Sequence, residues 1–167
     1  MAELTKETVT KKLTDKFGDI ILKTEEPYNF PTYTVKRDYI IDILKFLYND
    51  PELQFQFLTD ITGIHYTNPE EQLGAIYHLH NLFTNTRIRL KAFFPKEYPY
   101  IDSATAVFAA ANWMERETYD FYGIVFKGHP DLKRILNVDN MDYFPMRKEY
   151  RLEDATRTDK DDAMFGR

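Results

Sequence analysis

The chain has 167 residues, a formal net charge of −5 and no cysteine, and its length fits one compact domain with some extended material. The missing cysteines exclude disulfides, thiolate-held iron–sulfur clusters and cysteine-based zinc sites. Interspersed charges leave no basic face for nucleic acid. No apolar run nears the ~20 residues that span a bilayer, and residues 1–19 are too polar for a secretory signal. We therefore expect this protein to meet a membrane only through partners.

Two helices and two short strands are predicted within the first 50 residues. Val9, Leu13 and Phe17 recur every four positions between a capping Thr5 and a closing Gly18, which predicts a first helix. Apolar residues at i, i+3, i+4 and i+7 predict a second helix. The expected bounds are residues 5–17 and 37–48 for the helices, and 20–22 and 33–35 for the strands, the first of these strands being buried.

Three strand-like runs follow, at residues 55–66, 74–83 and 87–94. Their connections are short, so an antiparallel meander is the economical arrangement. Alternation in the middle run predicts one face with Tyr77, Leu79 and Phe83, and the opposite face with His78 and His80.

In the third run, residues 87–94, apolar and charged side chains alternate most regularly. It directs Arg87, Arg89 and Lys91 outward, which is either a docking surface for an acidic partner or a solvated sheet face.

A third helix is expected at residues 103–119, capped by Asp102 or Ser103, and Pro130 could start a short helical turn at 131–136. The predicted fold class is α+β, a two-layer domain with a mainly antiparallel sheet covered by helices, plus an extended C-terminal tail. The compact part is expected over residues 1–126, and the signature loop and tail over 127–167. At ~3.3 Å per residue, residues 145–167 could reach about 70 Å. They are suited to lie along a partner, or they form a frayed terminus.

Charged residues are densest at 115–130. Glu115, Glu117 and Asp120 could suggest acid–base chemistry. Arg116 lies among them, and its spacing to Asp120 predicts an i, i+4 ion pair. This arrangement favours a structural ion-pair network over a catalytic site.

Two other motifs lack essential parts. Gly123 and Gly128 have the glycine spacing of a phosphate-binding loop, but His129 and Pro130 stand where that loop needs Lys and Ser or Thr. His78 and His80 have a spacing that zinc or iron can use, yet a third ligand is not evident. A small metal-dependent hydrolase that uses these histidines with the carboxylates of 115–120 is therefore the weaker alternative.

Residues 115–136 read ERETYDFYGIVFKGHPDLKRIL. They resemble the signature E-R-E-x-x-D-x-[FY]-G-I-x-F-x-G-H-P-x-L-x-R-[IL]-L of the thirty-kilodalton (C) subunit family of complex I, the proton-pumping NADH:quinone oxidoreductase. Residues 145–150 are similar to the second half of a later family block, W-x-G-x-P-L-R-K-[DE]-[YF], and the resemblance covers roughly residues 37–150. The matched positions expected to matter are Glu115, Arg116, Glu117, Asp120, Gly123, Phe126, Gly128, His129, Pro130, Arg134, Pro145, Arg147 and Lys148.

The resemblance implies a scaffold subunit of the hydrophilic arm, peripheral on the cytoplasmic face of the bacterial inner membrane. It implies the D subunit, the large subunit of the quinone site, as the main partner, with the B and I subunits nearby, and no catalytic residue. No cofactor or metal is expected in this subunit, because FMN and the iron–sulfur clusters belong to other subunits. Two alternatives stay open: the equivalent subunit of a complex I-like membrane-bound hydrogenase, and an adaptor outside respiration.

Overall fold

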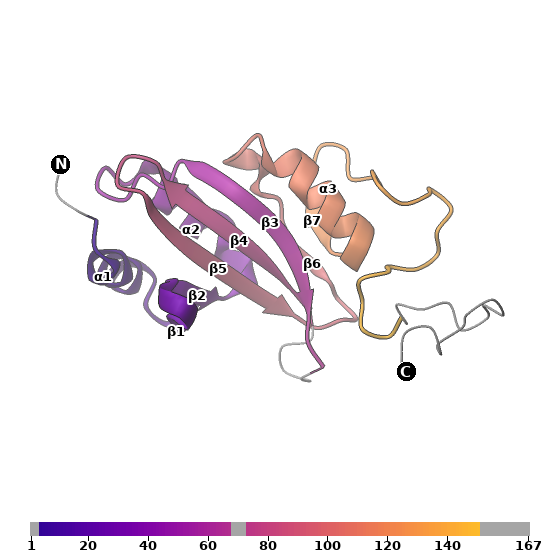
Figure 1. Ribbon diagram of the computed structural model, residues 1–167, viewed down its shortest axis with the longest axis horizontal. Helices are drawn as coiled ribbons and strands as arrows, with labels where there is room; N and C mark the ends of the chain where they lie inside the picture. Colours follow the sequence, from indigo (N-terminus) through magenta and orange to yellow (C-terminus); the bar gives the residue numbers. More distant parts are fainter. Residues whose placement is uncertain (1–3, 68–72, 151–167) are drawn as a thin grey trace, which may run out of the picture.

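The computed structural model describes residues 4–67 and 73–150. Within them the chain has the predicted α+β fold, with a five-stranded, mainly antiparallel sheet of order β1-β2-β5-β4-β3 (Figure 1). β3 (Phe57–His65), β4 (Leu73–Asn81) and β5 (Thr86–Phe94) form the expected meander. β2 (Thr32–Val35) pairs in parallel with β5, and β1 (Ile21–Glu25) pairs with β2 and forms an edge. The last part of the expected tail, residues 151–167, lies outside the described residues.

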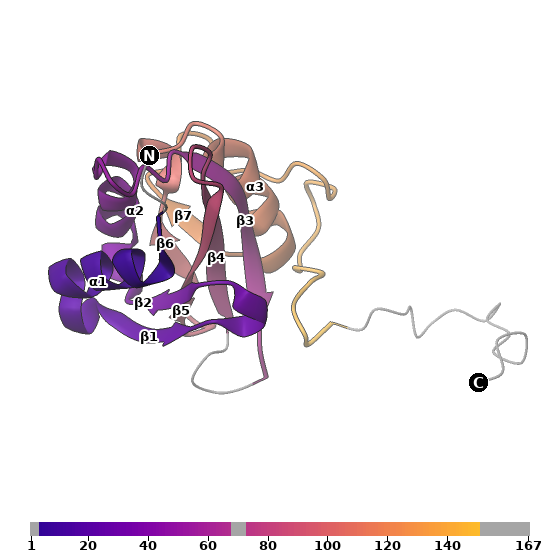
Figure 2. The same cartoon turned by 60° about the vertical axis from the view of Figure 1, so that its left-hand side comes forward.

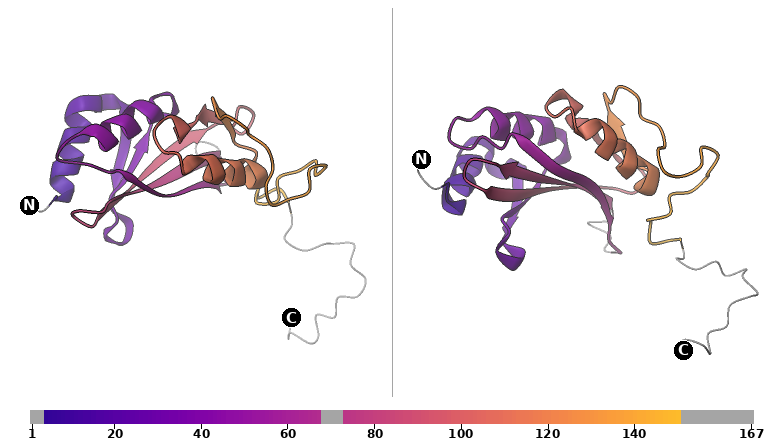
Figure 3. Two further views of the ribbon diagram at one scale, coloured as in Figure 1. Left: turned by 90° about the horizontal axis from the view of Figure 1, so that it is seen from above. Right: turned by 45° about the horizontal axis from the view of Figure 1, so that its top comes forward.

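The three α-helices lie on one side of the sheet (Figure 3). Part of the other side is covered by the turn before β2, whose Phe30 ring packs against His78 and the Arg89 guanidinium, and the rest of it is open. α1 (Lys6–Phe17) begins after Thr5, whose side chain accepts a hydrogen bond from the Thr8 N–H, and ends at Gly18, as predicted. α2 (Ile40–Asn49) follows a 3₁₀ turn at Arg37–Tyr39, so the expected second helix is confirmed with a tighter first turn. No helix in the described ranges is long and apolar enough to cross a bilayer.

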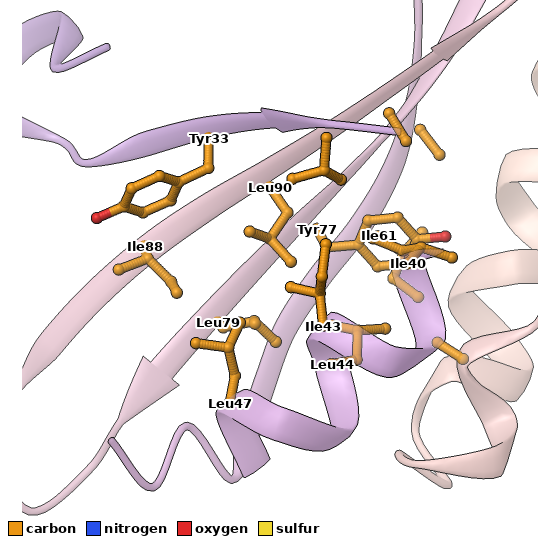
Figure 4. Close-up of a cluster of buried hydrophobic side chains, with 14 of the residues drawn as sticks. Tyr33, Ile40, Ile43, Leu44, Leu47, Ile61, Tyr77, Leu79, Ile88 and Leu90 are labelled. Atoms are coloured by element: carbon orange, nitrogen blue, oxygen red, sulfur yellow. The ribbon is translucent and has the colours of Figure 1, made fainter. Parts of the chain in front are cut away.

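The core lies between α2 and the meander. The apolar stripe of α2 meets the inward side chains of β3, β4 and β5 (Figure 4). Complete burial of one such aliphatic side chain stabilises the fold by roughly 1.5–3 kcal/mol, so this layer supplies much of the driving force. Its labelled members include Ile40, Ile43, Leu44, Leu47, Ile61, Tyr77, Leu79, Ile88 and Leu90, all of them buried.

The third helix begins eight residues later than predicted. α3 spans Ala111–Tyr122, and Ser103 instead caps a 3₁₀ turn at Ala104–Ala106. The apolar spacing from Ala104 to Ala111 resembles a helical stripe, but the Glu115 carboxylate bonds Ser103 and the Ala104 N–H and holds a separate turn. A local hydrogen bond of this kind competes with helix propagation.

Three strand predictions need correction. Ile20 lies in a 3₁₀ turn, and β1 is an exposed edge strand, with Leu22 58% exposed, because β2 covers only one of its sides. Phe83 does not face inward: Asn81 ends β4 by accepting hydrogen bonds from the two N–H groups of the following turn, and Phe83 is 64% exposed. Sequence periodicity also missed a parallel pair, β6 (Tyr100–Asp102) with β7 (Val125–Lys127), because three residues are too few to show a period.

Candidate interaction site at the end of the third helix

The signature segment covers the end of α3, β7 and the chain that follows. Residues 128–150 run beside α3 without helix or strand, on the side of the molecule away from α1 (Figure 2). Such irregular chain needs partners for its main-chain polar groups. The charged side chains of the signature provide many of these partners.

Glu115 ties α3 to the turn before it. Its buried carboxylate accepts hydrogen bonds from the Ser103 hydroxyl at 2.6 Å and from the Ala104 N–H at 2.5 Å. Burial raises the pKa of Glu115 to about 7, although both hydrogen bonds favour the charged form. Glu115 is therefore a buried cap whose charge changes near neutral pH.

Arg116 does not pair with Asp120, contrary to the helical spacing. Its Nε donates to the Lys133 carbonyl at 3.2 Å and its Nη2 to the Arg134 carbonyl at 3.3 Å. The guanidinium also lies 5.1 Å from the exposed ring of Trp113, within cation–π range. The physical reason is that donors of the loop already occupy the Asp120 carboxylate, so the long Arg116 side chain donates to loop carbonyls instead.

Asp120 is the acceptor around which the loop folds. Its Oδ2 accepts from three consecutive main-chain N–H groups, those of Ile135, Leu136 and Asn137, at 2.8–3.1 Å. Its Oδ1 accepts from the Arg134 guanidinium at 2.7 Å and from the Asn137 side chain at 3.1 Å. The helical turn expected at 131–136 is wrong, because the N–H groups of Ile135 and Leu136 donate to this carboxylate instead of to carbonyls four residues earlier.

Electrostatics favour the ionised form of Asp120. Burial alone would raise its pKa, since the side chain is fully buried. The main-chain donors of Asn137 and Leu136 and the Arg134 guanidinium outweigh burial and hold the pKa well below its usual range. The carboxylate therefore acts as a permanent anion at the centre of the loop.

Arg134 and Arg147 fix the second half of the loop. Arg134 donates to the Asp120 carbonyl and, through Nη2, to the carbonyls of Met141 and Tyr143 at 2.8 and 3.0 Å. Arg147 donates from Nε to the Tyr122 carbonyl at 2.6 Å. Both guanidinium groups thus point back into the chain that carries them.

Gly123 lets this half of the loop approach α3. It ends the helix with φ +70°, a conformation that glycine adopts at little cost. A Cβ at this position would lie 2.5 Å from the Phe144 ring, which packs against Tyr119, and 2.7 Å from the Arg147 guanidinium. A glycine at this matched position of the signature therefore has a steric reason.

The segment around His129 links β7 to the start of α3. His129 Nδ1 accepts from the Asp131 N–H at 3.0 Å, so its Nε2 carries the proton and donates to the Asn112 carbonyl at 3.0 Å. Phe126 before it is buried, whereas Gly128, at φ +81°, and Pro130 are exposed. His129 is thus held by main-chain atoms on both ring nitrogens.

The last described residues reach the end of β3. The Lys148 N–H donates to His65 Nδ1 at 2.9 Å, and Glu149 pairs with Lys96 at 2.8 Å. Burial lowers the pKa of His65, and the nearby Glu149 charge opposes this. Pro145 is half-buried, while Glu117 and the Lys148 residue as a whole are exposed. Among the predicted residues, Glu117 and Lys148 therefore present the most accessible charges.

The two strand histidines lie away from this cluster. His78 accepts the Arg89 Nε–H at Nε2, 2.9 Å away, and its Nδ1 lies 3.5 Å from Asp60. His80 bonds Asn85 at 2.9 Å. In ranges 4–67 and 73–150, no three His, Asp or Glu side chains are grouped so that they could hold a metal ion.

Sequence reasoning missed several members of the cluster, namely Asn137, Phe144 and the carbonyls that receive Arg116 and Arg134. No periodicity marks them, because they come from irregular chain. The only signal in the sequence was Gly123, since a glycine at a helix end can mark a close approach by other chain.

The sequence of this chain was compared with family models and with curated proteins. A family model described as the respiratory-chain NADH dehydrogenase, 30 Kd subunit, matches residues 33–156. A curated relative from Citrifermentans bemidjiense is 40% identical over 146 residues, 87% of this chain and 89% of the relative. One from Geobacter metallireducens is 38% identical over 158 residues, 94% of this chain and 95% of the relative. Both are named as the C subunit of NADH-quinone oxidoreductase.

Solved structures share the fold. The trypsin-resistant fragment (1-134) of Nqo5 has a TM-score of 0.65 and 27% identity, and covers 75% of this chain and 98% of that one. A chain of the membrane-bound sulfane sulfur reductase, an archaeal respiratory membrane complex, has a TM-score of 0.72 at 20% identity and covers 87% and 85%, a likeness of fold alone. Fold and sequence together are therefore those of a small α+β subunit of a respiratory-chain enzyme. This chain belongs to the 30 Kd subunit family of the respiratory-chain NADH dehydrogenase, complex I.

Proposed function

We propose that the chain is a scaffold subunit of the hydrophilic arm of a proton-translocating NADH:quinone oxidoreductase. It packs mainly against the D subunit, with the B and I subunits nearby, on the cytoplasmic face of the bacterial inner membrane. It supplies no catalytic residue and holds no cofactor, and the FMN, the iron–sulfur clusters and the quinone site belong to other subunits. Electron transfer needs cofactors at fixed separations, and a rigid domain that contacts several subunits preserves those separations.

One observation carries the proposal. The buried carboxylate of Asp120 and the guanidinium of Arg134 together hold residues 134–143, a stretch with no helix or strand. Reactive groups are usually directed into a cleft toward a substrate. These groups are directed at main-chain atoms, which supports a role in fixing the shape of a contact surface. Leu136 and Val138, each 63% exposed, lie on that surface.

The experiment that tests the proposal is Arg116→Ala, with Lys133→Ala as the control. Lys133 lies in the same loop but its side chain is exposed, and it pairs with the exposed Asp131. Arg116→Ala removes two hydrogen bonds from the loop and should release it from α3. The amount of the D subunit that co-purifies with the tagged chain from native membranes should fall strongly, while NADH:quinone turnover per assembled complex stays at the wild-type level.

Two further measurements keep this test decisive. Circular dichroism of the purified variant separates loss of the fold from loss of assembly. Normal recovery of the D subunit combined with reduced turnover per complex would contradict the scaffold role, because the residue would then act on the reaction itself. Lys133→Ala should leave both quantities unchanged.

A further inference from the structure

The open face of the sheet carries a groove that the proposed contact with the D subunit does not use. Two hollows of about 360 and 560 Å³ share Lys23, Thr34 and Phe93, so they form one continuous groove. The pairing register explains its position: Lys23 pairs with Thr34, and Thr34 pairs with Lys91, so these three side chains form a row across β1, β2 and β5. The three α-helices lie on the other side of this sheet (Figure 3).

The groove is basic on a chain that is acidic overall. Four cations line it, Lys23, Lys36, Arg37 and Lys91, against two carboxylates, Glu25 and Asp38. Lys36 also pairs with Asp19, which lies outside the lining, at 2.9 Å. The groove therefore keeps a surplus of one positive charge, in contrast to the net charge of −5 for the whole chain. The hydrogen bond from Lys23 and the charges of Lys23 and Lys91 lower the pKa of Glu25, which is the effect expected of a positive local potential.

The floor of the groove is aromatic. The Phe93 ring lies over Gly74 on the neighbouring strand, where a Cβ would be only 2.7 Å from that ring. Phe93 also contacts the ring of Tyr66, with centroids 5.9 Å apart. Because glycine has no side chain, the Phe93 ring can pack closely on β4, and it offers an apolar surface to an occupant of the groove.

We propose that this groove binds an acidic, extended segment of a neighbouring subunit of the complex. Adjacent strands are ~4.8 Å apart, so crossing β1, β2 and β5 covers about 10 Å, the length of three or four extended residues. Such a segment would direct a carboxylate to Lys91, beside the Lys23–Glu25 ion pair, and an apolar side chain to Phe93. A groove open to solvent and crossing three strands fits a length of chain better than a small molecule, which is usually enclosed.

The inference rests on the proposed function, since it requires neighbouring subunits. The first experiment places a p-benzoylphenylalanine photo-crosslinker at position 91 in the full chain and irradiates native membranes. After purification of the assembled complex, the cross-linked peptide should come from another subunit, and Asp and Glu should outnumber Lys and Arg around the attachment point. The same probe at position 11, on the exposed side of α1, should not reach that peptide.

The other outcomes overturn the inference. Attachment to a lipid, to a second copy of this chain or to the chain's own residues 151–167, or no adduct in an assembled complex, would each show that no acidic partner segment occupies the groove. Absence of the wild-type chain from the complex would instead contradict the proposed function. The two failures are therefore distinguishable.

Charge reversal provides an independent readout. Lys91→Glu should increase the fraction of the chain released from purified complex at a fixed salt concentration by roughly fivefold, the size of effect that exposed ion pairs produce. Lys11→Glu makes the same change of charge away from the groove and should not alter release. Lys91→Gln, which removes the charge without adding repulsion toward Glu25, should give an intermediate value, and equal release for all three variants would refute the proposal.

Discussion

Replacement of Asp120 by Asn tests directly whether one buried carboxylate organises the loop after α3. The carboxylate accepts five hydrogen bonds, three of them from consecutive main-chain N–H groups. Asparagine keeps the size of the side chain but has one acceptor oxygen and one NH₂ group. Its NH₂ group would face either the Arg134 guanidinium or the three N–H groups, so that donors oppose donors.

The expected loss of stability is large. Removal of one member of a buried ion pair typically costs about 3–5 kcal/mol, and each unsatisfied buried donor adds to the penalty. A domain of this kind is stable by roughly 5–15 kcal/mol in total. If the loop detaches without unfolding the sheet, the measured loss is limited to the free energy of local opening.

Two assays separate these cases. Denaturant unfolding of the purified chain gives the global loss, and hydrogen exchange at the main-chain N–H groups of residues 135–137 gives the local one. The control is Glu117→Gln, one turn earlier on the same helix and exposed, which should change stability by less than about 0.5 kcal/mol. Unchanged unfolding together with unchanged exchange at 135–137 in Asp120→Asn would refute the central role of this carboxylate.

The same residue gives a pH dependence of known sign. The pKa of Asp120 is lowered in the folded chain, so its stabilising contribution is present above the unfolded value of about 3.9 and is lost as pH falls toward the folded value. Stability of the wild-type chain should therefore decline below about pH 4. The Asn variant should lack this part of the decline.

Two further predictions concern neighbouring positions. The pKa of Glu115 is raised to about 7, so the wild-type chain should lose roughly 3 kcal/mol of stability as pH rises from about 4.5 through 7. Glu115→Gln should remove this dependence of stability on pH, which denaturant titrations between pH 5 and 8 would measure. An unchanged dependence in the variant would contradict this assignment. Gly123→Ala should lower the melting temperature more than Gly128→Ala, because both glycines have positive φ but only a Cβ at 123 would strike Phe144. Equal shifts of the melting temperature in the two variants would show that the close packing of Phe144 against position 123 does not contribute to stability.

The regular part of this fold could be predicted because its periodicity is long enough to detect. The stripe of α2 and the nine-residue alternation of β5 each predict one face correctly. Short elements escape this reasoning, as β6 and β7 did with three residues each. The first part of the expected third helix failed because one distant carboxylate, that of Glu115, holds a competing turn.

The candidate site was predicted in composition but not in geometry. The charged residues of the signature were identified, yet the expected pair of Arg116 with Asp120 does not form. Helical spacing reports which side chains are near each other on one helix, and it carries no information about irregular chain that returns to the helix. Arg134 and the N–H groups of 135–137 come from such chain, so only the structure could place them.

The parallel pairing of β2 with β5 has a consequence for how the chain is made. Thr32 lies opposite Arg89, whereas β3, β4 and β5 join neighbours that are close in sequence. During synthesis on the ribosome, β1 and β2 therefore cannot join the sheet until β5 has been made, while β3, β4 and β5 can pair as they emerge. Contacts of such long sequence separation are slow to form, so docking of the N-terminal hairpin is expected as the late step of folding.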